Sequence, residues 1–298
     1  MLSILIPTYN YVCAHLVCEL QKQCEEVQAS LGEENFRYEI IVADDASTDD
    51  ETISKNAVIE YLPNCRYLES ERNVGRAAIR NRLIDKAKGT WIMIIDADAE
   101  VVREDFVLTY WQAAAKLSDD CVIVGGIVTP EKADEGCELR HRYELAAEQI
   151  RTLEARRRNP DAYFSTFNFM ASRKVFNALR FDERCTQYGY EDALFGIELQ
   201  QYGFRIEHID NPLQHNGIND NASFLSNTET SLQTLHMLGR PMTDKARVTI
   251  AAQRLGMWRP CFRLIYKLCR PLLRRHLLSH HPNLKIFAFY KLGYYLSL

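Results

Sequence analysis

The stretch Trp91-Ile92-Met93-Ile94-Ile95-Asp96-Ala97-Asp98 joins the most apolar predicted strand of the chain to two carboxylates. Five apolar residues bounded by polar ones are typical of a strand that is buried on both faces of a parallel sheet. Asp96 and Asp98, at i and i+2 directly after this strand, can both reach one hard divalent cation. Asp-x-Asp also occurs in many solvated turns, so it is the placement after a buried strand that favours a metal site.

Strands and helices alternate along the chain up to this stretch. Strands are predicted over 2–6, 38–43, 65–68 and 91–95, and helices over 12–31, 51–61 and 75–89, the last ending at Gly89. Such alternation predicts βαβ units and an α/β fold with a Rossmann-like, mostly parallel central sheet and helices on both faces. Ligands bind at the carboxyl ends of the strands in such sheets. Beyond residue 130 we expect one long charged helix over 138–158, a strand over 164–171, a helix over 190–202 and a strand over 204–209.

Three absences narrow the class of protein. The sequence contains neither GxGxxG nor GxxxxGK[ST], which argues against dinucleotide oxidoreductases and P-loop NTPases. Its nine cysteines are scattered without a CxxC pair, which favours free thiols in a reducing cytoplasm. No secretion signal and no apolar run of about 18 residues is present, so we expect a cytoplasmic protein.

Five further side chains suit chemistry, and each has a structural alternative. Arg76 and Arg80 lie four apart on one helix face, where they could contact phosphate or simply be solvated. A carboxylate of Glu191-Asp192 could remove a proton from a hydroxyl, or it could stabilise the helix N-terminus. His215 could be a third metal ligand, although a lone histidine is more often structural.

Taken in order along the chain, these stretches resemble the family 2 glycosyltransferases, which have the GT-A fold. The matching pieces extend over residues 1–217 and are Ser3 to Asn10, Asp44 to Asp49, Asn73 to Arg76 with Arg80-Asn81, Asp96 to Asp98, Asn168, and Glu191-Asp192 followed by Gly203. No single piece is specific, but the ordered series is.

The resemblance implies a role for each matching residue. The nucleotide-sugar donor should contact Pro7, Thr8, Tyr9, Asp44, Asp45, Asn73, Gly75, Arg76, Arg80, Asp96 and Ala97, with Thr8 and Asp44 lining the nucleobase pocket. Mn²⁺ or Mg²⁺ should bind Asp98 and Asp96, and the resemblance moves His215 from a structural histidine to a metal ligand. Asp192 should be the catalytic base, with Glu191 as the other candidate, and Asn168 should contact the acceptor.

The resemblance also implies a domain plan and a reaction. Residues 1–130 would form the nucleotide-sugar-binding half of a GT-A domain, 131–220 its acceptor-binding half, and 221–298 a helical, basic C-terminal extension. The reaction would be an inverting, in-line transfer of one sugar, with a UDP-sugar as the expected donor. Ala46 replaces the usual glycine of the Asp-Asp-Gly-Ser loop, a change that we expect to disturb little. The Gln-x-x-Arg-Trp pattern of processive members is absent, which favours a single addition.

The C-terminal stretch differs sharply in charge from the rest. Residues 245–298 carry eleven Lys or Arg and no Asp or Glu, whereas the first 244 residues carry 25 basic and 40 acidic side chains. Pro260, Pro271 and Pro282 should break this stretch into short segments. Its basic, aromatic-rich composition suits a helix at the surface of an anionic membrane, with the rings of Trp258, Phe262 and Tyr266 facing lipid. A helical pair packed on the body, with its charges in water, is the alternative.

The leading hypothesis is therefore a glycosyltransferase that acts on a glycan or lipid-linked acceptor in bacterial surface polysaccharide synthesis, peripheral to the inner face of the cell membrane. A sugar-1-phosphate nucleotidyltransferase would need a Gly-rich N-terminal loop, which Pro7-Thr8-Tyr9-Asn10 is not. A non-catalytic nucleotide- or glycan-binding protein on the same fold is a third hypothesis. The acidic body argues against a nucleic-acid partner, and the sequence leaves a homo-oligomer open.

Overall fold

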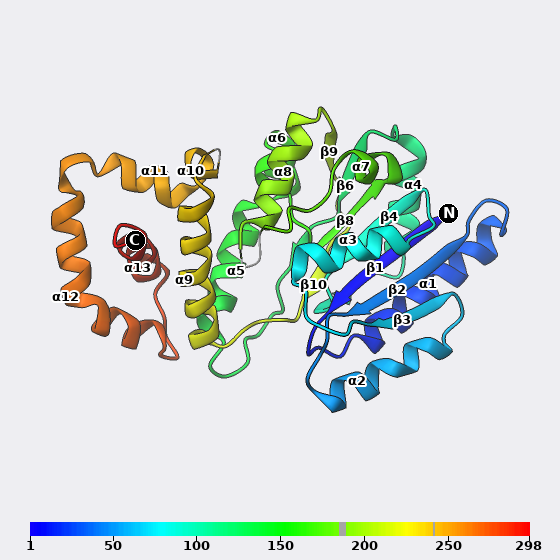
Figure 1. Ribbon diagram of the computed structural model, residues 1–298, viewed down its shortest axis with the longest axis horizontal. Helices are drawn as coiled ribbons and strands as arrows, with labels where there is room; N and C mark the ends of the chain where they lie inside the picture. Colours follow the sequence, from blue (N-terminus) through cyan, green and yellow to red (C-terminus); the bar gives the residue numbers. More distant parts are fainter. Residues whose placement is uncertain (185–188, 241) are drawn as a thin grey trace. The chain divides into compact units, whose positions relative to one another are not determined.

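A computed structural model of the chain describes residues 1–184, 189–240 and 242–298 (Figure 1). The chain forms two compact units. The first consists of Met1–Val128, Arg151–Thr186 and Phe195–Gly217, and the second of Thr129–Ile150, Gln187–Leu194 and Ile218–Leu298. These units divide the chain differently from the three ranges that we predicted, because residues 129–150 group with the C-terminal helices.

A large sheet forms the centre of the first unit. Its strands are β1 (Leu2–Thr8), β2 (Tyr38–Asp44), β3 (Cys65–Glu69), β4 (Trp91–Ile95), β6 (Cys121–Val124), β8 (Asn168–Ser172) and β9 (Arg205–His208). They lie in the order β3-β2-β1-β4-β8-β6-β9, and β8 runs antiparallel to both of its neighbours while the other pairs are parallel. The predicted α/β fold with a mostly parallel central sheet is confirmed.

Helices cover both faces of this sheet because successive residues of each strand point to opposite sides. Leu2 and Ile4 of β1 pack with α1 (Ala14–Leu31) and α4 (Phe106–Lys116). Leu5 points the other way, into a core shared with α3 (Arg76–Lys86), α7 (Arg173–Ala178) and the Phe195 end of α8 (Glu191–Gln201). The helix that we predicted over 51–61 is α2 (Asp50–Asn56) followed by a 3₁₀ turn, Ala57–Tyr61.

A small second sheet positions one candidate site residue. It consists of β5 (Ala99–Val101), β10 (Leu213–His215) and β7 (Ile127–Val128), in the order β5-β10-β7. β10 runs antiparallel to β5, and their register places His215 opposite Ala99. His215 therefore lies beside Asp98, the residue that precedes Ala99, although 117 positions separate His215 from Asp98 in the sequence.

Several predicted element bounds were wrong. α3 ends at Lys86, not at Gly89, and Gly89 instead allows a close approach to β1, since a Cβ there would lie 2.6 Å from the Ser3 amide nitrogen. The predicted long helix over 138–158 is two helices, α5 (Glu138–Ile150) and α6 (Leu153–Arg158). Thr152 is extended and caps α6 by accepting a hydrogen bond from the Ala155 N–H. The strand predicted over 164–171 begins only at Asn168, after a 3₁₀ turn at Asp161–Tyr163.

The second unit is helical. Besides α5 it contains α9 (Asn221–Leu238), α10 (Met242–Lys245), α11 (Arg247–Arg254), the 3₁₀ turn Gly256–Trp258, α12 (Arg259–Leu277) and α13 (Leu284–Tyr295). Its buried core is made of Leu139, Phe224, Leu225, Tyr266, Leu277, Phe287 and Tyr290. In the described ranges, no helix is long and apolar enough to cross a membrane.

Two prolines do not break the C-terminal stretch where we predicted. Pro260 lies in the first turn of α12, where a backbone N–H has no partner inside the helix in any case. Pro271 lies inside α12, which nevertheless runs as one helix of 19 residues. α12 is therefore long enough for side chains several turns apart to form one continuous face on its surface.

Candidate functional site

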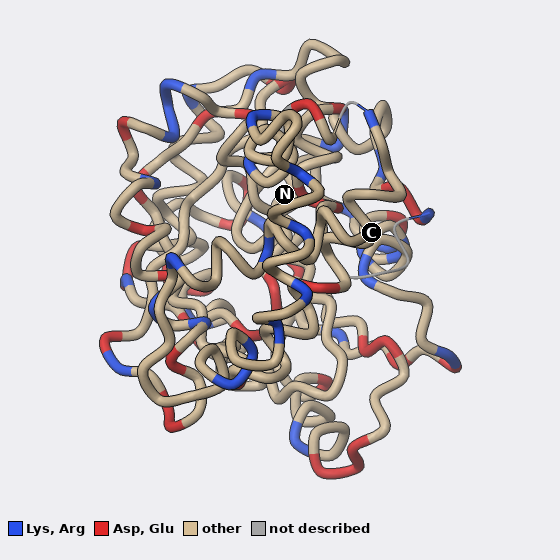
Figure 2. The backbone as a smooth tube through the Cα atoms, turned by 90° about the vertical axis from the view of Figure 1, so that its left-hand side faces the viewer, with Lys and Arg blue, Asp and Glu red and all other residues tan. Residues whose placement is uncertain are grey.

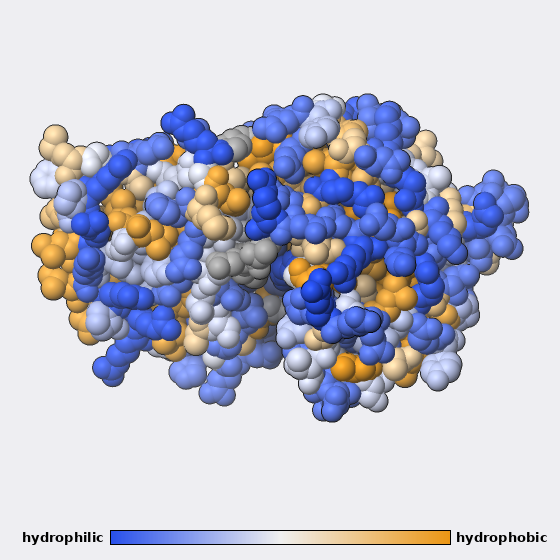
Figure 3. All heavy atoms as spheres, in the orientation of Figure 1, coloured by the Kyte–Doolittle hydropathy of each residue, from blue (hydrophilic) through white to orange (hydrophobic). Residues whose placement is uncertain are grey.

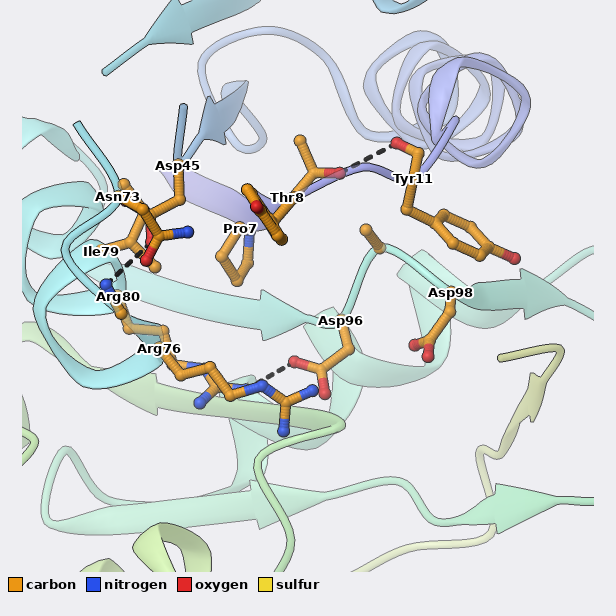
Figure 4. A pocket seen from close by; sticks show the side chains of 13 residues that line it. Pro7, Thr8, Tyr11, Asp45, Asn73, Arg76, Ile79, Arg80, Asp96 and Asp98 are labelled. Carbon is orange, nitrogen blue, oxygen red and sulfur yellow. Dashed lines mark hydrogen bonds and ion pairs between the residues drawn. The ribbon is translucent and has the colours of Figure 1, made fainter. Parts of the chain in front are cut away.

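A pocket opens at the carboxyl ends of β1 and β4, where the two parallel strands lie side by side (Figure 4). It is lined by Pro7, Thr8, Tyr9, Tyr11, Asp45, Asn73, Gly75, Arg76, Ile79, Arg80, Asp96, Ala97 and Asp98. Of the residues that we predicted to contact a donor, all but Asp44 line this one pocket. The fold thus gathers at one edge residues from four separate loops.

Asp44 does not line the pocket and is only 1 % exposed. Its carboxylate accepts hydrogen bonds from the Tyr67 hydroxyl at 2.6 Å and from the Ser47 amide at 2.6 Å. Both bonds fix the loop that follows β2. These contacts favour a role in shaping the loop and not the nucleobase contact that we predicted.

Asp45 shapes a second loop from the wall of the pocket. Its two carboxylate oxygens accept hydrogen bonds from the amides of Val74 and Gly75, each at 2.8 Å. Gly75 has a φ of 88°, which a residue with a side chain adopts only with strain. These two hydrogen bonds fix the residue at which α3 begins, and hence the positions at which Arg76 and Arg80 line the pocket.

Arg80 is buried, with 2 % of its surface exposed, which excludes the solvated helix face that we considered for it. Its Nη2 donates to Asp96 Oδ1 at 2.7 Å, and its guanidinium lies 5.6 Å from the centre of the Phe181 ring. Within the described part of the chain, Nε and Nη1 have no hydrogen-bond partner. Buried donors without partners are costly, which makes Arg80 an exception among the side chains of this pocket.

Asp98 is paired with His215, whose Nε2 lies 3.3 Å from Asp98 Oδ2. The pair is positioned by the small sheet and by the Asn216 amide, which donates to the Asp98 carbonyl at 2.9 Å. Burial alone would raise the pKa of Asp98, but the His215 hydrogen bond and the charges of His215 and Arg76 outweigh it and lower the pKa below its usual value. Asp98 is therefore ionised at neutral pH.

Asp96 and Asp98 lie in the loop after β4, and their carboxylates point to the same side (Figure 4). Their partners differ, since Asp96 pairs with Arg80 and Asp98 with His215. In the residues described, no three His, Cys, Asp or Glu side chains gather closely enough to hold a metal ion. Asp98 and His215 offer one oxygen and one nitrogen ligand. Mg²⁺ and Mn²⁺ usually take few protein ligands and complete their coordination with phosphate oxygens and water, so this pair fits such a cation.

Sequence reasoning missed three residues of this site. Tyr11 and Ile79 line the pocket, and burial, followed by the charge of Asp98, raises the pKa of Tyr11, so its phenol stays protonated. Gly217 lies directly against the Asp98 carboxylate, where a Cβ would overlap Oδ2. Tyr11 could have been predicted from its place in the loop after β1. Gly217 could not, because its role depends on the pairing of His215 with Asp98, which no sequence pattern indicates.

Asn168, which we predicted to contact the acceptor, is 1 % exposed at the start of β8. Its Oδ1 accepts from the Tyr110 hydroxyl at 2.7 Å, and its Nδ2 donates to the carbonyls of Gly126 and Asn211 at 3.1 and 2.9 Å. The acceptor role stays a prediction, and these contacts favour a structural role that ties three segments together.

Glu191 and Asp192 open α8 and belong to the second unit. Glu191 is buried, and its Oε2 accepts a hydrogen bond from the Gly189 amide at 3.1 Å. Asp192 is half-buried. Between Gly189 and Glu191, Tyr190 has a φ of 69°, which is unusual for a bulky residue and marks a sharply formed turn.

Comparison with known proteins bears on this site. Residues 3–180 match the family described as glycosyl transferase family 2. Glycosyltransferase GlyG of Streptococcus pneumoniae serotype 4 is 30 % identical over 134 residues, which are 45 % of this chain and 41 % of GlyG. The putative colanic acid biosynthesis glycosyl transferase WcaA of Escherichia coli K12 is 29 % identical over 100 residues, 34 % of this chain and 33 % of WcaA. The chain thus spans less than half the length of these curated relatives.

A solved structure shares the fold. The mannosyltransferase PcManGT from Pyrobaculum calidifontis, in complex with GDP-Man and Mn²⁺, superposes with a TM-score of 0.51 at 16 % identity, over 99 % of this chain and 84 % of that one. The family match covers more than half of the sequence and contains every residue that lines the pocket. The chain belongs to glycosyl transferase family 2.

Proposed function

We propose that the chain is an inverting, metal-dependent glycosyltransferase that moves one sugar from a nucleotide-sugar, a UDP-sugar in our hypothesis, to an acceptor hydroxyl. The observation that carries this proposal is that the buried cation Arg80, two of whose donors have no partner among the described residues, lines the same pocket as Asp96 and Asp98. A pocket with both a buried cation and ionised carboxylates suits a ligand that is itself an anion bound with a cation. A nucleoside diphosphate with Mn²⁺ or Mg²⁺ is such a ligand.

On the donor side, we assign one residue to the phosphate oxygens and two residues to the divalent cation. Arg80 would donate to the phosphate oxygens in a site shielded from water, where charge-assisted hydrogen bonds are strongest. Asp98 and His215 would hold the divalent cation, which supplies counter-charge for the departing diphosphate. The GDP-Man and Mn²⁺ of the mannosyltransferase complex support this reading of the pocket.

On the acceptor side, we assign the base to Asp192. The acceptor oxygen would form a bond to the anomeric carbon as the bond to the nucleoside diphosphate breaks, and the hydroxyl proton would pass to the Asp192 carboxylate. One such displacement inverts the anomeric centre. Glu191 is buried and accepts a backbone N–H, which favours its half-buried neighbour Asp192 as the base.

The acceptor class rests on the relatives. WcaA carries colanic acid biosynthesis in its name, and this supports a glycan or lipid-linked acceptor in bacterial surface polysaccharide synthesis. Because such acceptors lie at the inner face of the cell membrane, the proposal includes a peripheral location there.

The test is a panel of nucleotide-sugars with Mn²⁺, Mg²⁺ or EDTA, read by release of nucleoside diphosphate and by thermal shift. A donor at a hundred times its Kd should add about 2.7 kcal/mol to the free energy of unfolding. If no nucleotide-sugar stabilises the protein and none is cleaved with either cation, the proposal is wrong.

Asp192→Asn tests the base separately. The variant keeps the shape of the side chain but cannot accept the proton, so transfer should fall by roughly 10² to 10⁴ while donor affinity stays within a factor of two or so. Glu191→Gln is the matched control and should lose far less transfer. A product with retained anomeric configuration, determined by NMR, would contradict the single displacement.

A further inference from the structure

One face of α12 exposes a row of large apolar side chains. We call this row the apolar ridge; its members Leu264, Ile265, Leu268 and Leu272 are 60, 47, 72 and 70 % exposed. They recur at intervals of three and four residues and therefore share one side of the helix. Met257 and Trp258, just before α12, are 88 and 67 % exposed. Figure 3 shows hydrophobic atoms gathered along the left-hand edge, where Figure 1 draws α12.

The opposite face of α12 already has its packing partners. Tyr266 and Leu277 lie in the core of the second unit, and Tyr266 contacts the Tyr290 ring at 5.5 Å between centroids. Phe262 packs on Phe289 at 4.5 Å. Of the three rings that we expected to face lipid, only Trp258 is exposed, because the other two belong to this packed face. The side chains of the apolar ridge are therefore not part of the packed core of the second unit.

α12 also carries basic side chains. At about 100° per residue, Arg263 and Lys267 fall on the flank between the packed face and the apolar ridge, and Arg275 falls on the ridge side. Arg270 and Arg274 contact Glu229 at 3.6 and 3.5 Å and so belong to the fold. Arg263, Lys267 and Arg275 are exposed and form no ion pair with any residue that the structure describes. Figure 2 views the chain from the side on which Figure 1 draws α12. Residues 245–298 contain Lys and Arg but no Asp or Glu.

We propose that α12 docks on an anionic lipid surface. The apolar ridge enters the boundary between head groups and acyl chains, and Arg263, Lys267 and Arg275 extend to the lipid phosphates with their alkyl stems on the apolar side. Trp258 lies next to the ridge, and indole rings favour this depth of the membrane. α12 lies on the surface and does not span the bilayer, in line with its many charges.

A second copy of the chain would be a poor occupant of the same face. A twofold contact brings each patch against itself, so the cations beside one apolar ridge would meet the same cations of the other. Residues 245–298 contain no Asp or Glu to compensate them. An anionic leaflet does compensate them.

The test uses the full chain and vesicles, and needs no enzymatic activity, so it stands apart from the proposed function. Co-sedimentation compares vesicles of equal parts phosphatidylglycerol and phosphatidylcholine with vesicles of phosphatidylcholine alone. We expect binding to the anionic vesicles at low salt, at least tenfold weaker binding at high salt, and little binding to the neutral ones. A wild-type chain that ignores anionic vesicles at low salt overturns the proposal.

Two matched pairs of variants locate the contact. Leu268→Gln with Leu272→Gln should weaken binding at least tenfold, whereas Tyr61→Gln with Met237→Gln, which changes two side chains exposed by 89 and 64 % elsewhere, should not. Each basic residue near the leaflet adds roughly fivefold to the partition coefficient. Neutralising Arg263, Lys267 and Arg275 together to Gln should therefore cost about a hundredfold.

The control for charge neutralises Lys22, Lys88 and Lys132, which are exposed and lie outside α12. Equal losses in the two charge variants would show a general effect of net charge and overturn the proposal. Brominated lipids should quench the fluorescence of the wild type and not that of Trp258→Phe, a readout that holds even if a ridge variant folds poorly. If Leu268→Gln with Leu272→Gln abolishes a dimer and leaves vesicle binding unchanged, the ridge is a contact between copies and the proposal is wrong.

Discussion

The pocket and the apolar ridge depart from the usual distribution of side chains in opposite directions. The pocket buries charge, since Arg80 is 2 % and Asp45 4 % exposed, whereas the ridge exposes Leu268 and Leu272 by about 70 %. A buried charge and an exposed apolar row are the informative exceptions in a folded protein. In our two proposals, a ligand of a particular chemistry would relieve each departure: a phosphate group bound with a metal ion in the pocket, and an apolar surface on the ridge.

The two regions also differ in how firmly they are held. In the pocket, Asp45 accepts two backbone amides, Arg80 binds Asp96, and Asp98 binds His215. On the ridge, the apolar side chains stand in solvent. We therefore expect changes in the pocket to alter both binding and stability, and changes on the ridge to alter binding alone.

The largest effect should come from Asp98→Ala. Removing the ionised partner of His215 would remove the proposed cation site, and a departing diphosphate would lose several kcal/mol of stabilisation, which corresponds to at least a 10³-fold fall in turnover. The measurement is sugar transfer with Mn²⁺, alongside wild-type protein in EDTA, which should be similarly inactive. His215→Ala should lose less, since the carboxylate remains. Full activity of wild type in EDTA would show that the pocket works without a metal.

Arg80→Met should lower both stability and ligand affinity. The substitution leaves Asp96 without its partner in a largely buried place, which costs about 3 kcal/mol of unfolding free energy. It also removes the donors for a diphosphate, so calorimetry should show nucleoside diphosphate binding weakened by more than tenfold. Arg76→Met, one turn earlier on the same helix face but exposed, is the control and should lower stability much less. Equal melting of Arg80→Met and wild type would mean that Arg80 is not held as described.

The parts of this pocket that the sequence predicts are those that depend on local pattern. The strand Trp91–Ile95 was predicted at its observed bounds, because an apolar run that ends at Asp96 carries its own signal. The same holds for the loops after β1 and β4, whose residues must lie at the sheet edge once the sheet is parallel. Local pattern also indicated that residues 245–298 differ from the rest.

The parts that the sequence did not predict depend on contacts between distant residues. Asn168 meets Tyr110 from 58 positions away, and nothing local indicates that its amide is used inside the fold. Asp44 looks like its neighbour Asp45, and only the position of Tyr67 on β3 turns it inward. On α12, the composition suggested lipid contact, but only the packing of Tyr266 and Phe262 shows which face remains for it.

Ala46→Gly should produce a smaller effect and tests strain in the pocket loops. Ala46 has a φ of 63°, so the glycine that the family usually carries there would fit without strain. We expected this departure to disturb little, yet the left-handed backbone costs a residue with a Cβ about 1 kcal/mol. Glycine also gains entropy in the unfolded chain, so the net rise in unfolding free energy should be below about 1 kcal/mol. A lower melting temperature would show that Ala46 is not strained.

The smallest effect concerns the apolar ridge without lipid. Leu268→Gln with Leu272→Gln replaces side chains that stand in solvent, so urea unfolding should change by less than about 0.5 kcal/mol per substitution. Leu277→Ala, at the end of the same helix but fully buried, should cost about 2–5 kcal/mol. Anionic vesicles should then stabilise the wild type and not the double variant, because only a surface that binds the folded chain shifts its unfolding. A large loss of stability in the double variant without lipid would mean that the ridge is covered by the chain itself, and the contrast with the pocket would disappear.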